Sequence, residues 1–257
     1  MIYNYHTHTV RCHHAVDSDE EYIKKAIEAG IKYLGFSDHA PVPFSGGRGF
    51  HYHMDIEEGE EYVNTIRGLA DKYKNDIHIS VGFEMEYYPS CFEQMLNLAR
   101  NFRADYLILG QHFIGDEYPD GRGSRAYTEN PKHLKEYVEN VIKGIESGVF
   151  TYVAHPDIIN FGGDEDLYRT EMTRLCQASK KHGIPLEINL HGIQNNRFYP
   201  SERFFEIAGQ IGAPVTFGMD VHDSASILDK DQVYKAAEMV KRHGLNYIGM
   251  PKLIYLK

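Results

Sequence analysis

Short apolar segments alternate with longer amphipathic segments along the whole chain of 257 residues, and few folds accommodate this alternation. The apolar segments have the length of buried strands, and they are Ile2–Tyr5, Tyr33–Phe36, Ile77–Val81, Tyr106–Leu109, Tyr152–Ala154, Leu186–Asn189 and Val215–Phe217, with a late one at Tyr247–Ile248. The segments between them have apolar residues three or four positions apart, as helices do, and they are Tyr22–Ala29, Glu58–Tyr73, Cys91–Phe102, Lys132–Ser147, Asp166–His182, Glu202–Gln210 and Gln232–His243. Strands that alternate with helices predict βα units and therefore a parallel sheet.

A short pattern recurs at four places, where a glycine is followed by a strand and then by a polar residue. The four units are Gly30…Asp38-His39, Gly148…His155, Gly183…His191 and Gly212…Asp220. Each glycine fits the left-handed residue that closes a helix. The carboxyl ends of the strands carry the active site in α/β barrels and in open α/β sheets. We therefore predict one α/β domain over residues 1–257, a (β/α)7 TIM-like barrel with seven rather than eight strands; an open doubly wound sheet is the alternative.

Composition narrows the classes of partner. The formal net charge of −10 weighs against nucleic acid and an anionic membrane surface, which both attract Lys and Arg. It leaves an anionic small substrate open, because bound cations can reverse the local field. The three cysteines, Cys12, Cys91 and Cys176, form no disulfide framework and no CxxC motif, which indicates a reducing compartment. The sequence has no signal-peptide pattern and no apolar run near the roughly 20 residues of a membrane span, so we expect a cytoplasmic protein.

Several of the 15 histidines follow predicted strands. His6 and His8 are two positions apart, so on a strand both side chains face the same way and can reach one cation. Taken alone, this pair also fits two half-exposed polar residues on an edge strand. The context favours a metal site, because six of the seven strands place His, Asp or Glu at the same edge of the sheet. These residues are His6, His8, His39, Glu84, His112, His155, Asp220 and His222.

A cluster of this size indicates more than one ion. Neighbouring imidazoles and carboxylates shift one another's pKa strongly unless cations compensate their charges. Zinc in proteins takes about four ligands, so eight or nine ligands indicate two or three ions. Imidazole and carboxylate ligands without thiolate suit Zn, Mn or Fe better than Ca or Mg.

Two glycine-rich loops and one further carboxylate are additional candidates. Neither residues 45–49 nor residues 121–124 have the spacing of a P-loop or of a dinucleotide fingerprint. We interpret the first loop as a mobile lid whose Arg48 contacts an anionic substrate, and Arg122 and Arg125 beside the second loop are similar candidates. Glu86 follows Glu84 by two residues and either binds an amine of the substrate or supports a ligand histidine.

Seven short motifs together resemble those of the PHP (polymerase and histidinol phosphatase) family, and most of all its histidinol-phosphate phosphatase branch. They are His6-Thr-His8-Thr9, Cys12-His13-His14-Ala15, Ser37-Asp38-His39-Ala40-Pro41, Gly82-Phe-Glu84, Gly110-Gln-His112-Phe113, Ala154-His155-Pro-Asp157 and Phe217-Gly-Met-Asp220-Val-His222. They occur in the family's order and extend from residue 6 to residue 222, which is nearly the whole chain.

The resemblance implies a distorted seven-stranded barrel that holds three divalent metal ions. Carried over residue by residue, the first ion would be held by His6, His8, Glu84 and Asp220. Glu84 would bridge to a second ion with His112 and His155, and the third would be held by His14, His39 and His222. His13 is the alternative to His14. Catalytic roles would fall to Glu84, Asp220 and His39.

The chain departs from that branch at the phosphate site. The branch usually has a basic residue after the motif that contains His155, whereas residues 157–162 contain no Lys or Arg. Arg197 could hold the phosphate after the sixth strand, and a second contact would come from elsewhere, for example from Arg48. His191 is a further candidate for contact with the substrate. The expected reaction is in-line attack on phosphorus by a hydroxide that bridges the ions sharing Glu84.

The favoured substrate is accordingly L-histidinol phosphate, a small phosphate ester, which would be hydrolysed to L-histidinol and phosphate in histidine biosynthesis. The first alternative is a PHP phosphoesterase that acts on nucleotides or other small phosphate esters. The second is a non-catalytic metal-binding PHP module. A metal-dependent amidohydrolase on a similar barrel is a more distant alternative.

Overall fold

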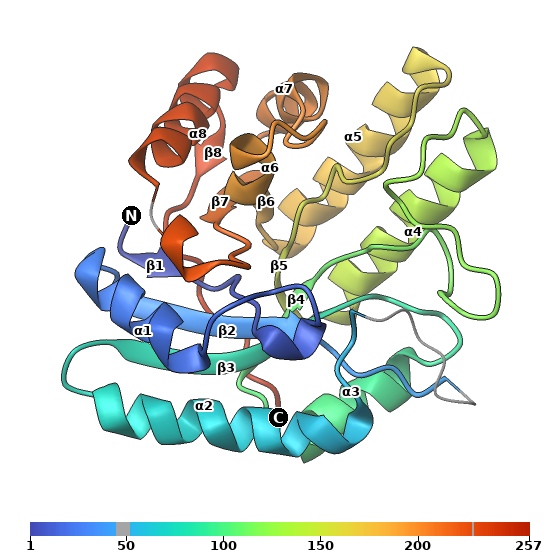
Figure 1. The fold of residues 1–257 in the computed structure, drawn as a ribbon. Helices are drawn as coiled ribbons and strands as arrows, with labels where there is room; N and C mark the ends of the chain where they lie inside the picture. Colours follow the sequence, from blue (N-terminus) through green and yellow to red (C-terminus); the bar gives the residue numbers. More distant parts are fainter. Residues whose placement is uncertain (45–51, 228) are drawn as a thin grey trace.

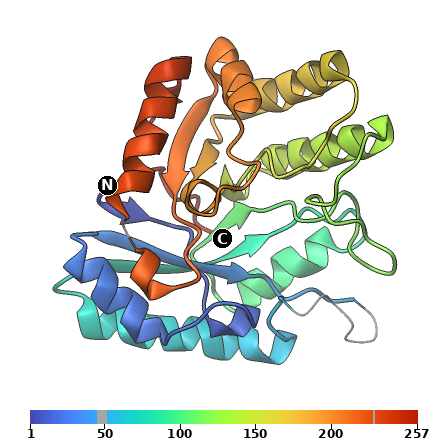
Figure 2. The same cartoon turned by 45° about the horizontal axis from the view of Figure 1, so that its top comes forward.

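The computed structural model describes residues 1–44, 52–227 and 229–257. In these residues eight parallel strands form one curled sheet in chain order, with helices on its outer side (Figures 1 and 2). The strands are β1 (Tyr3–Asn4), β2 (Tyr33–His39), β3 (His78–Met85), β4 (Tyr106–Leu109), β5 (Phe150–Val153), β6 (Leu186–Asn189), β7 (Pro214–Gly218) and β8 (Asn246–Tyr247). The helices are α1 (Asp19–Glu28), α2 (Gly59–Tyr73), α3 (Phe92–Asn101), α4 (Pro131–Ser147), α5 (Glu165–His182), α6 (Leu190–Gln194), α7 (Glu202–Ile211) and α8 (Lys230–His243).

The predicted strands and helices are all present, and the connections between them follow the predicted pattern. The glycines at the ends of α1, α4, α5 and α7 have φ of +80°, +71°, +69° and +70°, and they are Gly30, Gly148, Gly183 and Gly212. Each lets the chain leave a helix and enter the next strand within a few residues. The five-residue helix α6 was not predicted, because it is too short for a helical repeat to show. No helix in the described part of the chain is long and apolar enough to cross a bilayer.

The strand count differs from the predicted seven. The short β8 pairs with the start of β7 and makes an eighth strand. Beyond the ends of β1 and β7, Thr7 and Val221 form a parallel bridge. Two backbone hydrogen bonds hold this bridge, from His8 N to Val221 O (2.9 Å) and from Val221 N to His6 O (3.1 Å). The segments that follow the first and seventh strands therefore meet at the carboxyl edge of the sheet.

A second, smaller cluster of buried apolar residues lies on the inner side of the curled sheet. Alternate strand residues face the helices or the interior. On β4, Leu107 and Leu109 belong to the large core shared with the helices, whereas Tyr106 and Ile108 belong to a smaller cluster. The other buried members of that cluster are Tyr3, Tyr5, Tyr152 and Ala154. Burial of each such large side chain contributes roughly 1.5–3 kcal/mol. The inner cluster forms an apolar base for the polar residues that face inward at the carboxyl edge.

Candidate metal centre

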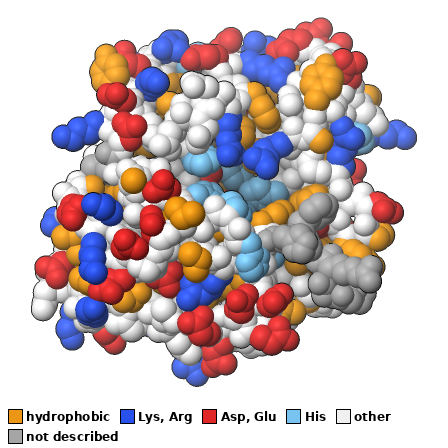
Figure 3. Space-filling view, viewed as in Figure 1, with side chains coloured by type: hydrophobic (Ala, Val, Ile, Leu, Met, Phe, Trp, Pro, Cys, Tyr) orange, Lys and Arg blue, Asp and Glu red, His pale blue; other side chains and the backbone are white. Residues whose placement is uncertain are grey.

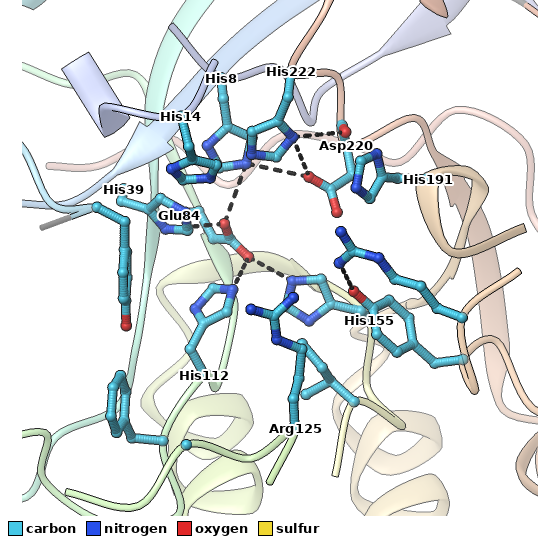
Figure 4. A pocket seen from close by; sticks show the side chains of 16 residues that line it. His8, His14, His39, Glu84, His112, Arg125, His155, His191, Asp220 and His222 are labelled. Atoms are coloured by element: carbon cyan, nitrogen blue, oxygen red, sulfur yellow. Dashed lines mark hydrogen bonds and ion pairs between the residues drawn. The ribbon is translucent and has the colours of Figure 1, made fainter. Parts of the chain in front are cut away.

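The polar residues predicted to follow the strands meet in one cavity of about 660 Å³ at the carboxyl edge of the sheet (Figure 4). The lining residues are His8, His14, His39, Tyr52, Glu84, His112, Phe113, Gly123, Arg125, His155, Ile158, His191, Arg197, Tyr199, Asp220 and His222. His6 is fully buried and contacts Glu84 and Asp220 at the floor. The structure therefore brings all nine predicted ligands to one place.

Glu84 lies at the centre of this cluster. Its Oε2 is 3.5 Å from His6 Nε2, 3.4 Å from His8 Nε2 and 3.3 Å from His39 Nδ1. Its Oε1 is 2.8 Å from His155 Nε2 and 3.5 Å from His112 Nε2. The two oxygens of one carboxylate thus face two different groups of imidazoles, which is the arrangement needed to bridge two ions.

A further group of three histidines lies beside the first. The ligand atoms of His14, His39 and His222 lie within 4.8 Å of one another. His14 lines the cavity, whereas its neighbour His13 has a left-handed backbone (φ +61°) and does not line it. The geometry therefore favours His14 of the two candidates. Cys12 also lies within 4.8 Å of His8 and His222, and it is buried.

Several buried polar atoms in this cluster have no hydrogen-bond partner among the described residues. They are His6 Nε2, His8 Nε2, His39 Nδ1, both carboxylate oxygens of Glu84, and His155 Nδ1. An unsatisfied buried polar atom costs roughly 1–3 kcal/mol, and more when it is charged. Several such atoms in one spot are therefore costly unless a ligand satisfies them. Lone pairs of imidazole and carboxylate are metal ligands, so the residues fit divalent cations.

The charges within the cluster shift one another's pKa strongly. Burial lowers the pKa of His6, but Glu187, Asp220 and Glu84 raise it to about 10. Burial and the neighbouring His8 hold the pKa of His39 and of His222 well below the ordinary value. Burial opposes ionisation of Glu84, but the histidines around it hold its pKa well below the ordinary value. Such mutual dependence is expected of a site whose charges are balanced by bound cations.

Glu187 on β6 supports the cluster and was missed by the sequence analysis. Its Oε1 lies 2.8 Å from His6 Nδ1, and its Oε2 accepts hydrogen bonds from His155 N (2.9 Å) and Asn189 Nδ2 (2.8 Å). A carboxylate on the far nitrogen of a ligand histidine fixes the ring and raises its basicity. The sequence carried a signal, because an acidic residue inside a buried apolar strand rarely lacks a partner.

Glu86 occupies the same kind of position behind His112. Its Oε1 lies 2.7 Å from His112 Nδ1, its side chain is fully buried, and it does not line the cavity. Sequence analysis left open whether Glu86 binds a substrate amine or supports a ligand. The geometry favours support of His112 and places Glu86 out of reach of a substrate in this cavity.

Two of the predicted ligands have an unusual backbone conformation. His155 has φ of +29° and Asp220 has φ of +53°, both in the region that residues with a Cβ rarely adopt. Such a conformation costs of order 1–3 kcal/mol and persists where the surroundings impose it. Both residues directly follow strands and turn their side chains into the cavity.

Two arginines and one histidine line the walls of the cavity above the cluster. Arg197 donates a hydrogen bond to the Tyr199 hydroxyl, and Arg125 follows the second glycine-rich loop. His191, at the start of α6, is partly buried and lines the same cavity. Figure 3 shows histidines at the floor of a hollow with basic side chains at its border. Arg48 and the loop at 45–49 lie outside the described residues.

A parallel barrel with imidazoles and carboxylates converging at the carboxyl ends of its strands is the architecture of a metal-dependent hydrolase. The PHP domain family model matches residues 4–191, and the chain belongs to this family.

Similar proteins agree with this class. A protein of Deinococcus radiodurans named "Probable histidinol-phosphatase" is 24% identical over 238 residues, with coverage of 86% of each chain. The histidinol-phosphatase of Bacillus subtilis is 23% identical over 256 residues, which cover 86% of this chain and 94% of that one. The crystal structure of histidinol phosphate phosphatase from Lactococcus lactis, in complex with Zn, L-histidinol and phosphate, has a TM-score of 0.71 at 20% identity. That comparison covers 95% of this chain and 94% of the other, and it confirms the predicted fold.

Proposed function

We propose that this protein is a metal-dependent phosphomonoesterase that hydrolyses L-histidinol phosphate to L-histidinol and phosphate. The observation that carries the proposal is the position of Glu84, whose two oxygens face separate groups of histidines within one cavity. The names of the similar proteins support the substrate, and the PHP family supports a phosphoesterase. The proposal includes one domain over residues 1–257 and a location in the cytoplasm.

Three divalent ions, drawn from Zn, Mn and Fe, fit the donor groups of the cluster. We assign His6, His8, Glu84 and Asp220 to the first ion, Glu84, His112 and His155 to the second, and His14, His39 and His222 to the third. Bound ions supply a nucleophilic hydroxide at neutral pH and neutralise negative charge on a phosphate. In this proposal Glu84, Asp220 and His39 are catalytic through their position beside the reacting atoms.

The walls of the cavity would orient the ester. An aligned guanidinium can donate two parallel hydrogen bonds to phosphate oxygens, and the hydrogen bond from Arg197 to Tyr199 would help to align this one. Nδ1 of His191 lies 3.3 Å from Nδ2 of Asn195, and this nitrogen can only donate, so Nδ1 accepts and Nε2 of a neutral His191 carries the proton. Burial lowers the pKa of His191, which favours this neutral form. His191 can therefore donate a hydrogen bond to the leaving oxygen or to the phosphate.

A second candidate is another small phosphate ester, such as a nucleotide. The carboxylates that line the described part of the cavity are Glu84 and Asp220, and both belong to the metal cluster. Neither is free to pair with the ammonium group of histidinol. An ester without an ammonium group would therefore lose no ion pair with the described walls of the cavity, so the substrate panel must include such esters.

The test is to purify the protein, measure its metals by mass spectrometry and assay phosphate release. The panel contains L-histidinol phosphate, nucleoside monophosphates and a simple aryl phosphate. We expect two or three ions per chain and the highest kcat/KM for L-histidinol phosphate. Asp220→Asn serves as a control that should lose metal and activity together. Preferential hydrolysis of nucleotides would replace the substrate, and a loaded protein with no activity on the panel would favour a non-catalytic metal-binding module.

A further inference from the structure

The cavity contains an arginine that compensates for a missing basic residue. Residues 157–162 follow His155 and contain no Lys or Arg, so this segment supplies no positive charge to a bound phosphate. Arg125 lines the cavity from a different loop, the one between β4 and α4. Figure 4 shows its side chain beside His112 and His155, directed into the cavity. We propose that Arg125 is the second phosphate-binding arginine and acts with Arg197; the inference rests on the proposed function.

Hydrogen bonds hold the backbone around Arg125 against the segments that follow β4 and β5, which contain His112 and His155. Ser124, which is fully buried, donates from N to the carbonyl of His112 (2.7 Å) and from Oγ to the carbonyl of Gln111 (2.9 Å). Asn160, after β5, donates from N to the carbonyl of Ser124 (2.9 Å) and from Nδ2 to the carbonyl of Arg125 (3.3 Å). The loop is therefore positioned by the same two segments that deliver His112 and His155. An arginine on such a loop has a defined place relative to the cluster.

The charge of Arg125 has no carboxylate partner among the described residues, unlike that of six of the eleven arginines that the structure describes. Those that form ion pairs with Asp or Glu are Arg11, Arg67, Arg169, Arg174, Arg203 and Arg242. No described carboxylate lies within 4.0 Å of the guanidinium of Arg125 or of Arg197. Both line the cavity, where they face a cluster that would carry divalent cations. The positive charges of the two arginines and of the bound metal ions would repel one another, and an anion bound between them would remove this repulsion.

The charges of both arginines also affect the pKa of the same tyrosine, Tyr199. Burial raises the pKa of Tyr199 to about 12, and the charges of Arg197 and Arg125 both oppose this rise. Arg125, Arg197 and Tyr199 all line the same cavity, so both guanidinium groups lie within electrostatic reach of one region of its wall. A phosphate dianion placed there could accept charge-assisted hydrogen bonds from each.

The test compares Arg125→Ala with Arg122→Ala. Arg122 lies in the same loop, is exposed, donates to the carbonyl of Tyr127 and does not line the cavity, so it controls for a change in loop charge. The first readout is the affinity of the metal-loaded protein for inorganic phosphate, measured by calorimetry. We expect about 10- to 100-fold weaker binding for Arg125→Ala, the range for loss of a charged hydrogen bond, and little change for Arg122→Ala. Arg125→Lys should restore part of the loss.

The second readout separates this inference from the proposed substrate. Metal content and melting temperature should match the wild type in all these variants, so that a weaker phosphate affinity is not a folding defect. If phosphate binding depends on Arg125 but L-histidinol phosphate is not hydrolysed, the inference stands and the substrate is wrong. If L-histidinol phosphate is hydrolysed and Arg125→Ala has the phosphate affinity and kcat/KM of Arg122→Ala, the substrate stands and the inference is overturned.

Discussion

Glu187 Oε1 lies 2.8 Å from His6 Nδ1, and both side chains are fully buried under the metal cluster. The contact leaves His6 Nε2 as the nitrogen that faces Glu84 and Asp220. Since the carboxylate holds the proton on Nδ1, the lone pair of Nε2 is available to an ion. The position of one buried carboxylate therefore decides which nitrogen of His6 would bind a metal ion in the proposed site.

We predict that Glu187→Gln weakens metal binding without unfolding the protein. The amide can still accept a hydrogen bond from His6, but it lacks the negative charge that makes the ring more basic. Loss of such support typically costs about 10- to 100-fold in metal affinity. The measurement is metal content after dialysis against a graded series of chelator concentrations. Glu171→Gln, which neutralises a buried carboxylate on α5 outside the site, is the control and should retain the wild-type midpoint.

Gly110 is predicted to be irreplaceable because of the space that Glu84 occupies. A Cβ at this position would overlap the carboxylate of Glu84, so Gly110→Ala must displace the central ligand. We expect loss of metal and of phosphate release in an otherwise folded protein. Gly68→Ala is the matched control, since its new Cβ on α2 meets nothing within 4 Å. That change should stabilise the protein by about 0.5–1 kcal/mol; an active, metal-loaded Gly110→Ala protein would contradict the prediction.

The strands and the metal cluster were predictable because they repeat a local rule. Six of the seven predicted strands are short, apolar segments with a His, Asp or Glu at the carboxyl end, so eight of the nine candidate ligands could be found without tertiary contacts. The family resemblance already favoured His14 over His13, and the structure supports that choice, because His14 lines the cavity and His13 does not. The side that each one faces depends on the left-handed backbone of His13.

Other features depend on contacts between distant segments. Arg125 is near the cluster because Ser124 and Asn160 join two loops, and their residue numbers do not reveal this hydrogen bond. The late apolar segment Tyr247–Ile248 was noted but left out of the count of seven, because only its pairing with the start of β7 shows that it joins the sheet. Glu86 was assigned two possible roles, since only the short distance to His112 Nδ1 distinguishes support of a ligand from contact with a substrate.

Removal of the metals should lower the melting temperature as well as abolish activity. The unpartnered atoms of His6, His8 and Glu84 are buried, so the folded protein without ions keeps polar atoms that water cannot reach. One site with free metal at about 100 times its dissociation constant contributes about 2.7 kcal/mol to the free energy of unfolding. Melting curves with and without chelator test this, and added metal should restore the original curve. An unchanged melting temperature in protein shown to be metal-free would contradict it.

Buried tyrosines should make the protein unfold cooperatively in alkali. Burial holds the pKa of Tyr62, Tyr88 and Tyr106 well above the ordinary value, and burial with nearby tyrosines raises the pKa of Tyr5 to about 12. In the unfolded chain a tyrosine has a pKa of about 10. A pKa raised by folding contributes stability that is complete below the unfolded value and is lost as the pH rises through the folded one. We therefore expect tyrosinate absorbance and loss of far-UV circular dichroism to change in one step above about pH 10. The same protein in denaturant should titrate gradually, and ionisation of these tyrosines with an intact dichroism signal would show that they are not buried as described.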